Sequence, residues 1–273
     1  MRMKYEEYQE YKKNKNINYE NILIGIGLNQ VDNLKPSEYF YKAVENSSSY
    51  EELEEKIIEY YKNADNKEIA RTKECDLVSQ RIAKIIDDEG FSFSPITLKS
   101  IHRKIFTGIF PQTMEKYVGN FRKVNIFKEE AILNGKSVNY ANYDDILDLL
   151  EYDFEKEKKN DYSKMNNDEL IKKISNFVSN IWQIHPFREG NTRTIAVFTI
   201  KYLNSIGFEV NNDIFKEYSK YFRNALVLSN YADKDKSIDV LYLESFFKKL
   251  LIDKNLELKE IGFKKINNKR RNK

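Results

Sequence analysis

The sequence contains few of the residues that cross-link, kink or interrupt a chain. Its 273 residues include one cysteine, four prolines, nine glycines and two histidines. The lone Cys75 excludes an intramolecular disulfide, fits a reducing compartment and is expected to be a small buried helix residue. No apolar run approaches the ~20 residues of a membrane-spanning helix, and residues 1–7 are too acidic and polar for a signal peptide. We therefore expect a cytoplasmic protein with no membrane partner; export as an effector is left open.

The sequence also lacks an excess of charge of one sign. It has 46 basic and 43 acidic residues, a net charge of +3, so no nucleic-acid partner is expected. An Asn-rich basic segment occupies residues 264–273. Such a segment can contact RNA or an acidic partner, but a solvated chain end is the commoner state. We expect residues 256–273 to form a flexible basic tail.

Scarce glycine and proline, together with long amphipathic runs, predict an all-α protein. We divide the chain into a small helical segment, residues 1–65, broken by Gly25, Gly27 and Pro36, and a larger core, residues 66–255. Ser49 and Glu52 have the spacing of a capping box at one helix start. The predicted helices are Tyr19–Leu28, Pro36–Asn46, Tyr50–Lys62, Lys67–Asp88, Pro95–Thr107, Tyr143–Lys158, Asp168–Gln183, Thr192–Ile206, Asn212–Tyr231 and Ile238–Asp253.

One segment departs from this helical pattern and predicts a β-hairpin. Residues 131–133 and 137–140 flank Asn134-Gly135, a dipeptide that supplies the positive φ angles of a two-residue hairpin turn. A lone hairpin is marginal without support. It is therefore either a surface ornament or a flap that binds an extended segment of a partner by strand addition.

The most informative stretch is residues 185–194, His-Pro-Phe-Arg-Glu-Gly-Asn-Thr-Arg-Thr. His185 can accept a proton near neutral pH, and Glu189 is a hard oxygen ligand suited to Mg²⁺. Gly190 and Asn191 tolerate backbone conformations that direct N–H groups at an anion. Arg193 offers several donors to a phosphate oxygen.

The neighbouring residues complete this predicted phosphate site. A helix starting at Thr192 would place its positive dipole end against the same anion, and Phe187 would pack the loop on the core. Each residue taken alone has a simpler explanation, because His-Pro ends helices and Gly-Asn is ordinary turn chemistry. The ensemble at this spacing favours phosphate-transfer chemistry.

The stretch resembles the signature of the Fic family (Fic/Doc-type nucleotidyl transferases), H-x-F-x-[D/E]-G-N-x-R-x-x-R, at His185, Phe187, Glu189, Gly190, Asn191 and Arg193. Residues 101–106 and 119–122 also resemble elements that precede a Fic core. The resemblance implies a Fic-type helical bundle with one small β-hairpin flap. It implies His185 as the base, Glu189 as the metal ligand, and residues 190–193, Thr192 included, as nucleotide-binding residues.

Other roles follow from the resemblance alone. A late helix of Fic proteins passes near the nucleotide base, which implies nucleotide-binding roles for Tyr221 and Asn224, although packing of the helix explains its aromatic residues equally well. In the flap, Ile132, Leu133, Ser137 and Val138 would bind the target segment. His102 has no evident partner and is expected to be a packed core histidine.

One position departs from the family pattern. The last arginine of the motif would fall at position 196, where this chain has Ala196. The resemblance implies that this arginine, where it is present, binds the terminal phosphate of ATP. The motif therefore predicts the type of reaction more firmly than it predicts which molecule donates the transferred group.

Residues 27–36 resemble the inhibitory segment of the antitoxins that accompany Fic toxins, [S/T]-x-x-x-E-[G/N]. Here Leu28 replaces the hydroxyl residue, Asp32 replaces the glutamate, and Asn33 fits the pattern. The position that such an acid should face is Ala196, so inhibition through that ion pair is in doubt. Thr72 to Asp76 offers a weaker alternative placement, and the whole segment can also be a stabilising cap.

We thus expect an enzyme that transfers AMP from Mg²⁺-bound ATP to a Tyr, Thr or Ser hydroxyl of a target protein, inhibited by residues 1–65. The alternatives are a transferase of another phosphate-containing group, a kinase, a hydrolase that removes the modification, and a pseudoenzyme that binds nucleotide without turnover. A homo-oligomer is compatible with the sequence.

Overall fold

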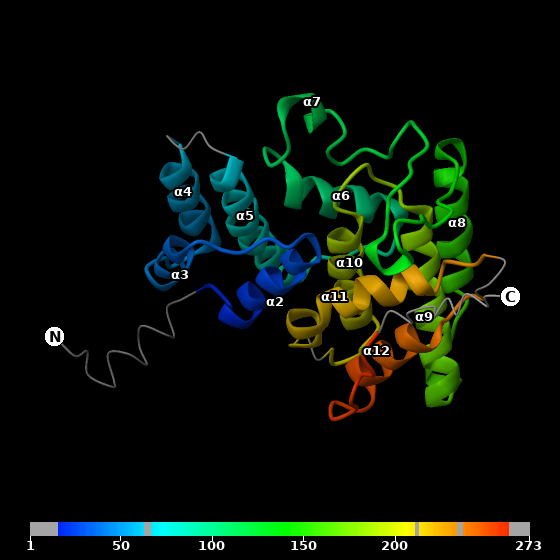
Figure 1. The fold of residues 1–273 in the computed structure, drawn as a ribbon. Coiled ribbons are helices and arrows are strands. Elements are labelled where there is room, and N and C mark those ends of the chain that lie inside the picture. Colours follow the sequence, from blue (N-terminus) through cyan, green and yellow to red (C-terminus); the bar gives the residue numbers. More distant parts are fainter. Residues whose placement is uncertain (1–15, 63–66, 211–212, 234–236, 262–273) are drawn as a thin grey trace, which may run out of the picture.

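The computed structural model describes residues 16–62, 67–210, 213–233 and 237–261, and within these ranges the protein is helical (Figure 1). The helices are α2 (Tyr19–Asn29), α3 (Glu38–Glu45), α4 (Tyr50–Tyr61), α5 (Lys67–Asp87), α6 (Pro95–Phe106), α7 (Gln112–Glu115), α8 (Ile146–Glu157), α9 (Asn167–Ile184), α10 (Asn191–Ser205), α11 (Asp213–Leu228) and α12 (Leu241–Leu251). Apart from the short α7, each corresponds to a helix predicted from periodicity. No helix in the described ranges has the length and apolarity needed to cross a lipid bilayer.

Side chains fix the starts of several helices. Asn166 and Glu169 form a complete capping box at the start of α9. At α4 the Ser49 side chain accepts from the Glu52 amide, while the Glu52 carboxylate bonds to Ser48 instead. The box predicted there is therefore only half formed.

Two groups of buried apolar residues hold the helices together, and α5 contributes to both. Leu77 and Ala83 face the smaller group, which joins α5 to α2, α3 and α4. Val78 and Ile82 face the larger group, which fills the space among α6 and α8 to α12. In Figure 1, α3 and α4 lie at one end of the molecule and α8 at the other, with α5 between them. The helix α5 is thus the shared wall between the N-terminal helices and the core.

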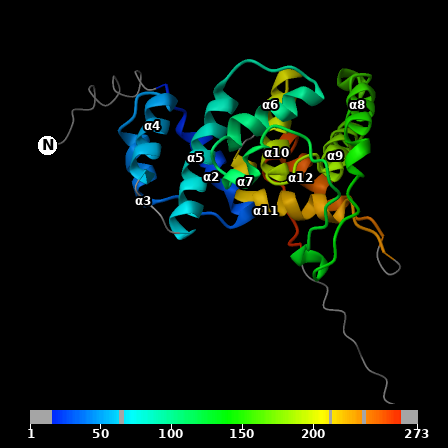
Figure 2. The same ribbon diagram turned by 90° about the horizontal axis from the view of Figure 1, so that it is seen from above.

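The helix α2 lies between α5 and α11 because it carries two glycines (Figure 2). A Cβ added to Gly25 would lie 2.4 Å from the Ser79 carbonyl oxygen of α5, and one added to Gly27 would lie 2.4 Å from Lys216 Cα of α11. The prediction that these glycines break the segment is wrong, since α2 runs through both. They permit close backbone approach on two sides.

The predicted β-hairpin is absent from the described residues. Residues 131–133 form a 3-10 turn, η2 (Ala131–Leu133), followed by Asn134 and Gly135 with φ values of 54° and 86°. The turn conformation was therefore predicted correctly, but the strands on either side were not. Residues 128–140 form a loop, called the 128–140 loop below.

Leu258 and Ile261, within the predicted tail, are partly buried against the core. Residues 262–273 lie outside the described residues. Cys75 is buried on α5, as expected.

Candidate active site

The motif forms the connection between α9 and α10. His185 ends α9 in the left-handed conformation, with φ of 51°. The next residue is Pro186, whose ring disfavours a helical conformation of the residue before it. Gly190 precedes α10 with φ of 73°. The five peptide units from His185 to Gly190 therefore reverse the chain between two rigid helices.

The His185 side chain is buried and is poised to accept a proton. Its Nδ1 donates to the Trp182 carbonyl oxygen at 3.3 Å, which leaves the lone pair on Nε2, and Nε2 has no hydrogen-bond partner. The Tyr140 ring lies against the imidazole with centroids 4.3 Å apart. Burial, followed by the positive charge of Lys128, lowers the pKa of His185 well below 6.5. The imidazole is therefore neutral at physiological pH, as a general base requires.

Asn191 and Thr192 use their side chains to hold the loop. The Asn191 amide accepts from the Phe187 amide at 2.9 Å and donates to its carbonyl at 2.8 Å. The Thr192 hydroxyl accepts from the indole Nε1 of Trp182 at 3.0 Å. Because these side chains are already hydrogen-bonded, only the backbone N–H groups of the two residues, at the start of α10, are left to contact a nucleotide.

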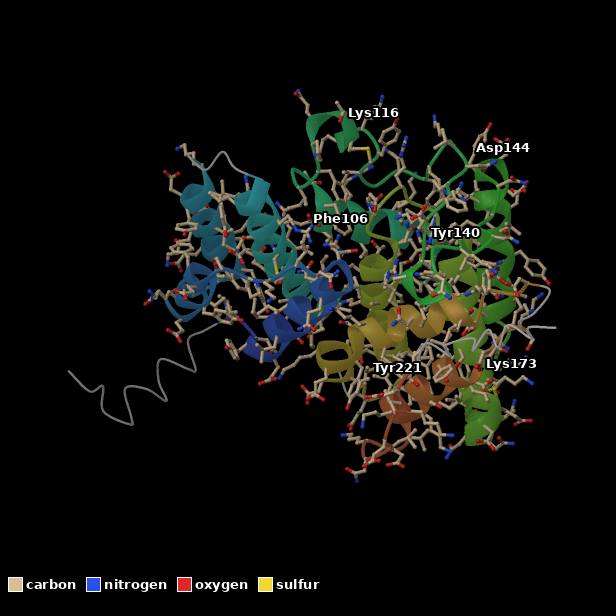
Figure 3. All side chains as sticks on the ribbon, in the orientation of Figure 1. Phe106, Lys116, Tyr140, Asp144, Lys173 and Tyr221 are labelled. Atoms are coloured by element: carbon tan, nitrogen blue, oxygen red, sulfur yellow. The ribbon has the colours of Figure 1, made fainter. Side chains whose placement is uncertain are left out.

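No side chain caps α10, so its first-turn N–H groups are free for an anion. Phe106 closes the space beside this helix end, and a Cβ on Gly190 would lie 2.4 Å from Phe106 Cε2. Figure 3 labels Phe106 and Tyr140, which contact the motif through Gly190 and His185. Gly190 thus has the left-handed conformation that the sequence predicts for it, and binding of an anion there stays a prediction.

Two side chains outside the motif fix its path. Arg122 donates to the backbone carbonyls of His185, at 2.8 Å, and Ile184, at 3.2 Å. His102 donates from Nε2 to the Glu189 carbonyl at 3.1 Å, and its Nδ1 accepts from the Gly119 amide at 2.9 Å. Its ring stacks on the buried Phe187 with centroids 4.0 Å apart. His102 is therefore a core histidine, as predicted, but one that positions the motif.

The Glu189 carboxylate projects from the loop and is half exposed, with 53% of the side chain accessible. The Lys128 ammonium lies 3.0 Å from its Oε2. The described residues contain no group of three or more His, Cys, Asp or Glu side chains that could hold a metal ion. One carboxylate beside an anion-binding helix end fits Mg²⁺, which retains waters and takes most other ligands from substrate phosphates. Glu189 would be its protein ligand.

Arg193 is buried, and both terminal nitrogens of its guanidinium contact the N-terminal half of the chain. Its guanidinium lies 3.0 Å from the Asp32 carboxylate, and it donates to Asn29 Oδ1 at 2.8 Å and to Glu74 Oε1 at 3.0 Å. It also stacks over the Phe106 ring. We call the three acceptors Asn29, Asp32 and Glu74 the Arg193 latch.

These contacts correct the predicted partner of Asp32. The sequence aligned Asp32 with position 196, but Ala196 is completely buried in the core and Asp32 pairs with Arg193. Asn33 adopts the left-handed conformation that ends η1 (Gln30–Asp32), and its side chain accepts from Lys220 at 2.8 Å. Asn29 and Glu74 were not predicted as site residues. Glu74 falls within the alternative placement, Thr72 to Asp76, although Asp76 itself bonds to Ser37 and Tyr61.

The structure does not bring the remaining predicted residues onto the motif. Tyr221 lies beside Tyr242 and Phe246 of α12, and burial raises its pKa to about 12. Asn224 is half-buried on α11. The neighbouring Arg223 pairs with Glu130, which lies in the 128–140 loop and is 1% exposed.

The proposed flap residues are divided between core and loop. Leu133 and Val138 are buried, so their side chains are not displayed to a partner. Ile132 is half-buried, and the Ser137 hydroxyl accepts from the Lys128 amide at 3.2 Å.

Residues 92–203 match the model of the Fic/DOC family. This part of the chain is a Fic/DOC domain. It contains the whole 185–194 motif together with His102 and Arg122, whereas the acceptors of the Arg193 latch lie before it.

One solved structure of similar fold is the N-terminal FIC domain of Bep8, a VirB-translocated effector protein from Bartonella sp. 1-1C, with 18% identity and a TM-score of 0.50; the match covers 67% of this chain and 87% of that one. A weaker match is to the N-terminal Fic domain of a Bartonella effector protein from Bartonella sp. AR 15-3, with 16% identity and a TM-score of 0.49, covering 65% of this chain and 81% of that one. None of the curated proteins compared with the chain matches it.

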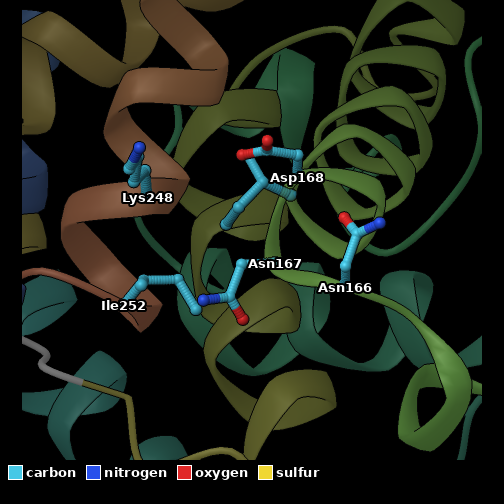
Figure 4. Close-up of a pocket in the computed structure, with 6 residues that line it drawn as sticks. Asn166, Asn167, Asp168, Lys248 and Ile252 are labelled. Carbon is cyan, nitrogen blue, oxygen red and sulfur yellow. The ribbon is translucent and has the colours of Figure 1, made fainter.

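A separate surface pocket of about 410 Å³ lies at the opposite end of α9, between its first turn and α12 (Figure 4). It is lined by Asn166, Asn167, Asp168, Ile171, Lys248 and Ile252. The Asn166 side chain there already caps α9. The pocket is therefore separated from the motif by the length of the helix.

Proposed function

We propose that the Fic/DOC domain of this protein is a protein adenylyltransferase that transfers AMP from ATP to a hydroxyl side chain of a target protein. The observation that carries the proposal is the unpartnered Nε2 of a neutral, buried His185, in the same loop as the uncapped start of α10. One group can remove a proton while the other binds phosphate. Mg²⁺ on Glu189 would supply positive charge between the ATP phosphates.

The reaction follows from these positions. The target hydroxyl oxygen forms a bond to the α-phosphorus, and its proton passes to His185 Nε2. The bond between the α-phosphorus and the bridging oxygen breaks, and pyrophosphate leaves with that electron pair. The N–H groups of the first turn of α10 stabilise the developing negative charge.

The direct test compares the full chain with His185→Ala after incubation with Mg²⁺ and ATP labelled at the α-phosphate. Label should appear on the protein or on a target from lysate, and the substitution should reduce it by at least about a hundredfold, as expected for loss of a general base. Label that persists in His185→Ala, or that appears neither in the full chain nor in a full chain carrying Asp32→Asn and Glu74→Gln, contradicts the proposal.

A second candidate is transfer of a different phosphate group, because Ala196 stands where the family pattern has its second arginine. Parallel reactions with α-labelled and γ-labelled ATP distinguish the two. Label from the γ-position alone indicates a kinase. Nucleotide binding without label from either position indicates a pseudoenzyme.

We also propose that the Arg193 latch holds the enzyme inactive. Arg193 is the motif arginine expected to bind phosphate, and two carboxylates and an amide already contact its two terminal nitrogens. A phosphate would have to displace these charge-assisted interactions, each stronger than a neutral hydrogen bond.

The latch is tested with Asp32→Asn and Glu74→Gln combined in the full chain. Labelling should rise by about tenfold or more, because the competing negative charges are removed while the side-chain shapes remain. Glu54→Gln is the matched control, since it breaks the Arg81–Glu54 pair between α4 and α5 without touching Arg193. An equal effect of both changes would mean that loosened packing, not the latch, controls activity.

A further inference from the structure

The cations around the motif differ in how firmly they are held. Arg122 is committed to backbone carbonyls. Arg193 is held by the latch, and Arg223 donates to both carboxylate oxygens of the buried Glu130, at 2.7 and 3.2 Å. Lys128, in contrast, pairs with the half-exposed carboxylate of Glu189. An exposed ion pair contributes little stability and exchanges partners readily.

The position of Lys128 is nevertheless well defined. Its amide donates to the Ser137 hydroxyl, and two residues later Glu130 anchors the 128–140 loop to α11 through Arg223. The Lys128 side chain is 25% exposed, and its charge contributes to lowering the pKa of His185. A flexible ammonium is thus held at the base of an anchored loop, beside both the predicted metal ligand and the predicted base.

A divalent cation bound to the Glu189 carboxylate would repel the Lys128 ammonium, because like charges a few ångströms apart raise each other's free energy. When Mg²⁺ takes Glu189, Lys128 must find another anion. Lysine has three donors on a flexible stem, and the phosphates that accompany Mg²⁺ would be the nearest uncommitted anions. The chain also has Ala196 in place of the second motif arginine. A cation from outside the motif could therefore supply the positive charge that this arginine would bring to the phosphates.

We propose that Lys128 is a ligand of the nucleotide phosphates, held on Glu189 until a divalent cation takes that carboxylate. The inference rests on the proposed function and adds a specific residue to it. It makes two linked claims. Lys128 competes with the metal for Glu189 in the free protein, and it binds phosphate in the loaded one.

The experiment uses the full chain carrying Asp32→Asn and Glu74→Gln, so that the latch does not oppose binding. The probe is α,β-methylene ATP, whose carbon bridge prevents AMP transfer, titrated by calorimetry with Mg²⁺ present. Lys128→Met is compared with Lys136→Met, the matched control, because Lys136 lies in the same loop but pairs with Asp233. Lys128→Met should weaken binding about tenfold, the value of one charge-assisted contact, and Lys136→Met by less than about twofold.

The same proteins are then titrated with Mn²⁺ alone, and free Mn²⁺ is followed by electron paramagnetic resonance. Lys128→Met should bind Mn²⁺ more tightly than the Lys136→Met control, because the competing ammonium is gone. A loss of nucleotide affinity below twofold, or an unchanged or weaker Mn²⁺ affinity, overturns the Lys128 inference. If the parent protein with the opened latch does not bind the analogue at all, the proposed function fails and the inference fails with it.

Discussion

At the scale of single residues, the motif depends on two left-handed backbone conformations at its ends. His185 adopts φ of 51°, which is unfavourable for a non-glycine residue, and this conformation ends α9 at the motif. Gly190 adopts φ of 73° without strain and leaves room for Phe106. The sequence predicted the need for glycine here, but not the neighbour that makes it necessary.

Gly190→Ala is therefore expected to cost more stability than an ordinary left-handed glycine. Gly207 is the matched control, because its φ is 90° and a Cβ there would have nothing within 4 Å. Gly207→Ala should lower the unfolding free energy by about 1 kcal/mol through backbone strain alone. Gly190→Ala should lower it by about 1–3 kcal/mol more, because the methyl group overpacks against Phe106. Urea unfolding followed by circular dichroism measures both, and equal costs would contradict the assigned contact.

At the scale of elements, local patterns gave the helices but not the 128–140 loop. Asn134 and Gly135 have the positive φ values that a hairpin turn needs. Tertiary contacts set the conformation of the residues on either side of this turn, because Leu133 and Val138 are buried and Glu130 pairs with Arg223 on α11. A strand pair supported only by itself is marginal, so these contacts prevail over the local preference.

The Glu130–Arg223 pair should therefore be the main anchor of this loop. Glu130→Gln removes the charge opposite Arg223 within the fold and is expected to lower the unfolding free energy by roughly 3 kcal/mol. Lys136→Met breaks the exposed Lys136–Asp233 pair of the same loop and should leave the unfolding free energy nearly unchanged.

Hydrogen exchange of the amides in residues 128–140 checks the same assignment locally. Exchange should accelerate in Glu130→Gln and remain close to that of the unmodified protein in Lys136→Met. Comparable exchange in the two variants would show that Leu133 and Val138 hold the loop without the ion pair.

At the scale of the whole molecule, α5 joins two apolar clusters, and both histidines are buried in the larger part. This burial makes stability depend on pH. The pKa of His102 is lowered from 6.5 to about 4, mainly by burial, and burial lowers that of His185 well below 6.5. On acidification below about pH 6.5 the unfolded chain binds protons on these side chains before the folded protein does.

The unfolding free energy should therefore fall as the pH is lowered from about 6.5 towards 4, by up to about 1.4 kcal/mol per pH unit for each histidine. Urea unfolding at several pH values measures this slope, and His102→Asn should reduce it by the contribution of one histidine. Burial raises the pKa of Asp76, Asp153 and Glu157, which acts in the opposite direction. These carboxylates are present both in the unmodified protein and in His102→Asn, so the difference between their slopes of unfolding free energy against pH gives the contribution of His102. Equal slopes in the two proteins would contradict a neutral, buried imidazole at His102.

The sequence by itself determined the helices and the chemistry of the motif, because helical periodicity and a ten-residue loop are local properties of the chain. It did not determine what the motif arginine binds. Arg193 meets Asn29 and Glu74 across 164 and 119 positions. Such contacts exist only once the glycines of α2 allow that helix to pack closely between α5 and α11. The tertiary structure thus decided which side chains contact the motif arginine, because the packing of distant helices sets which charges become neighbours.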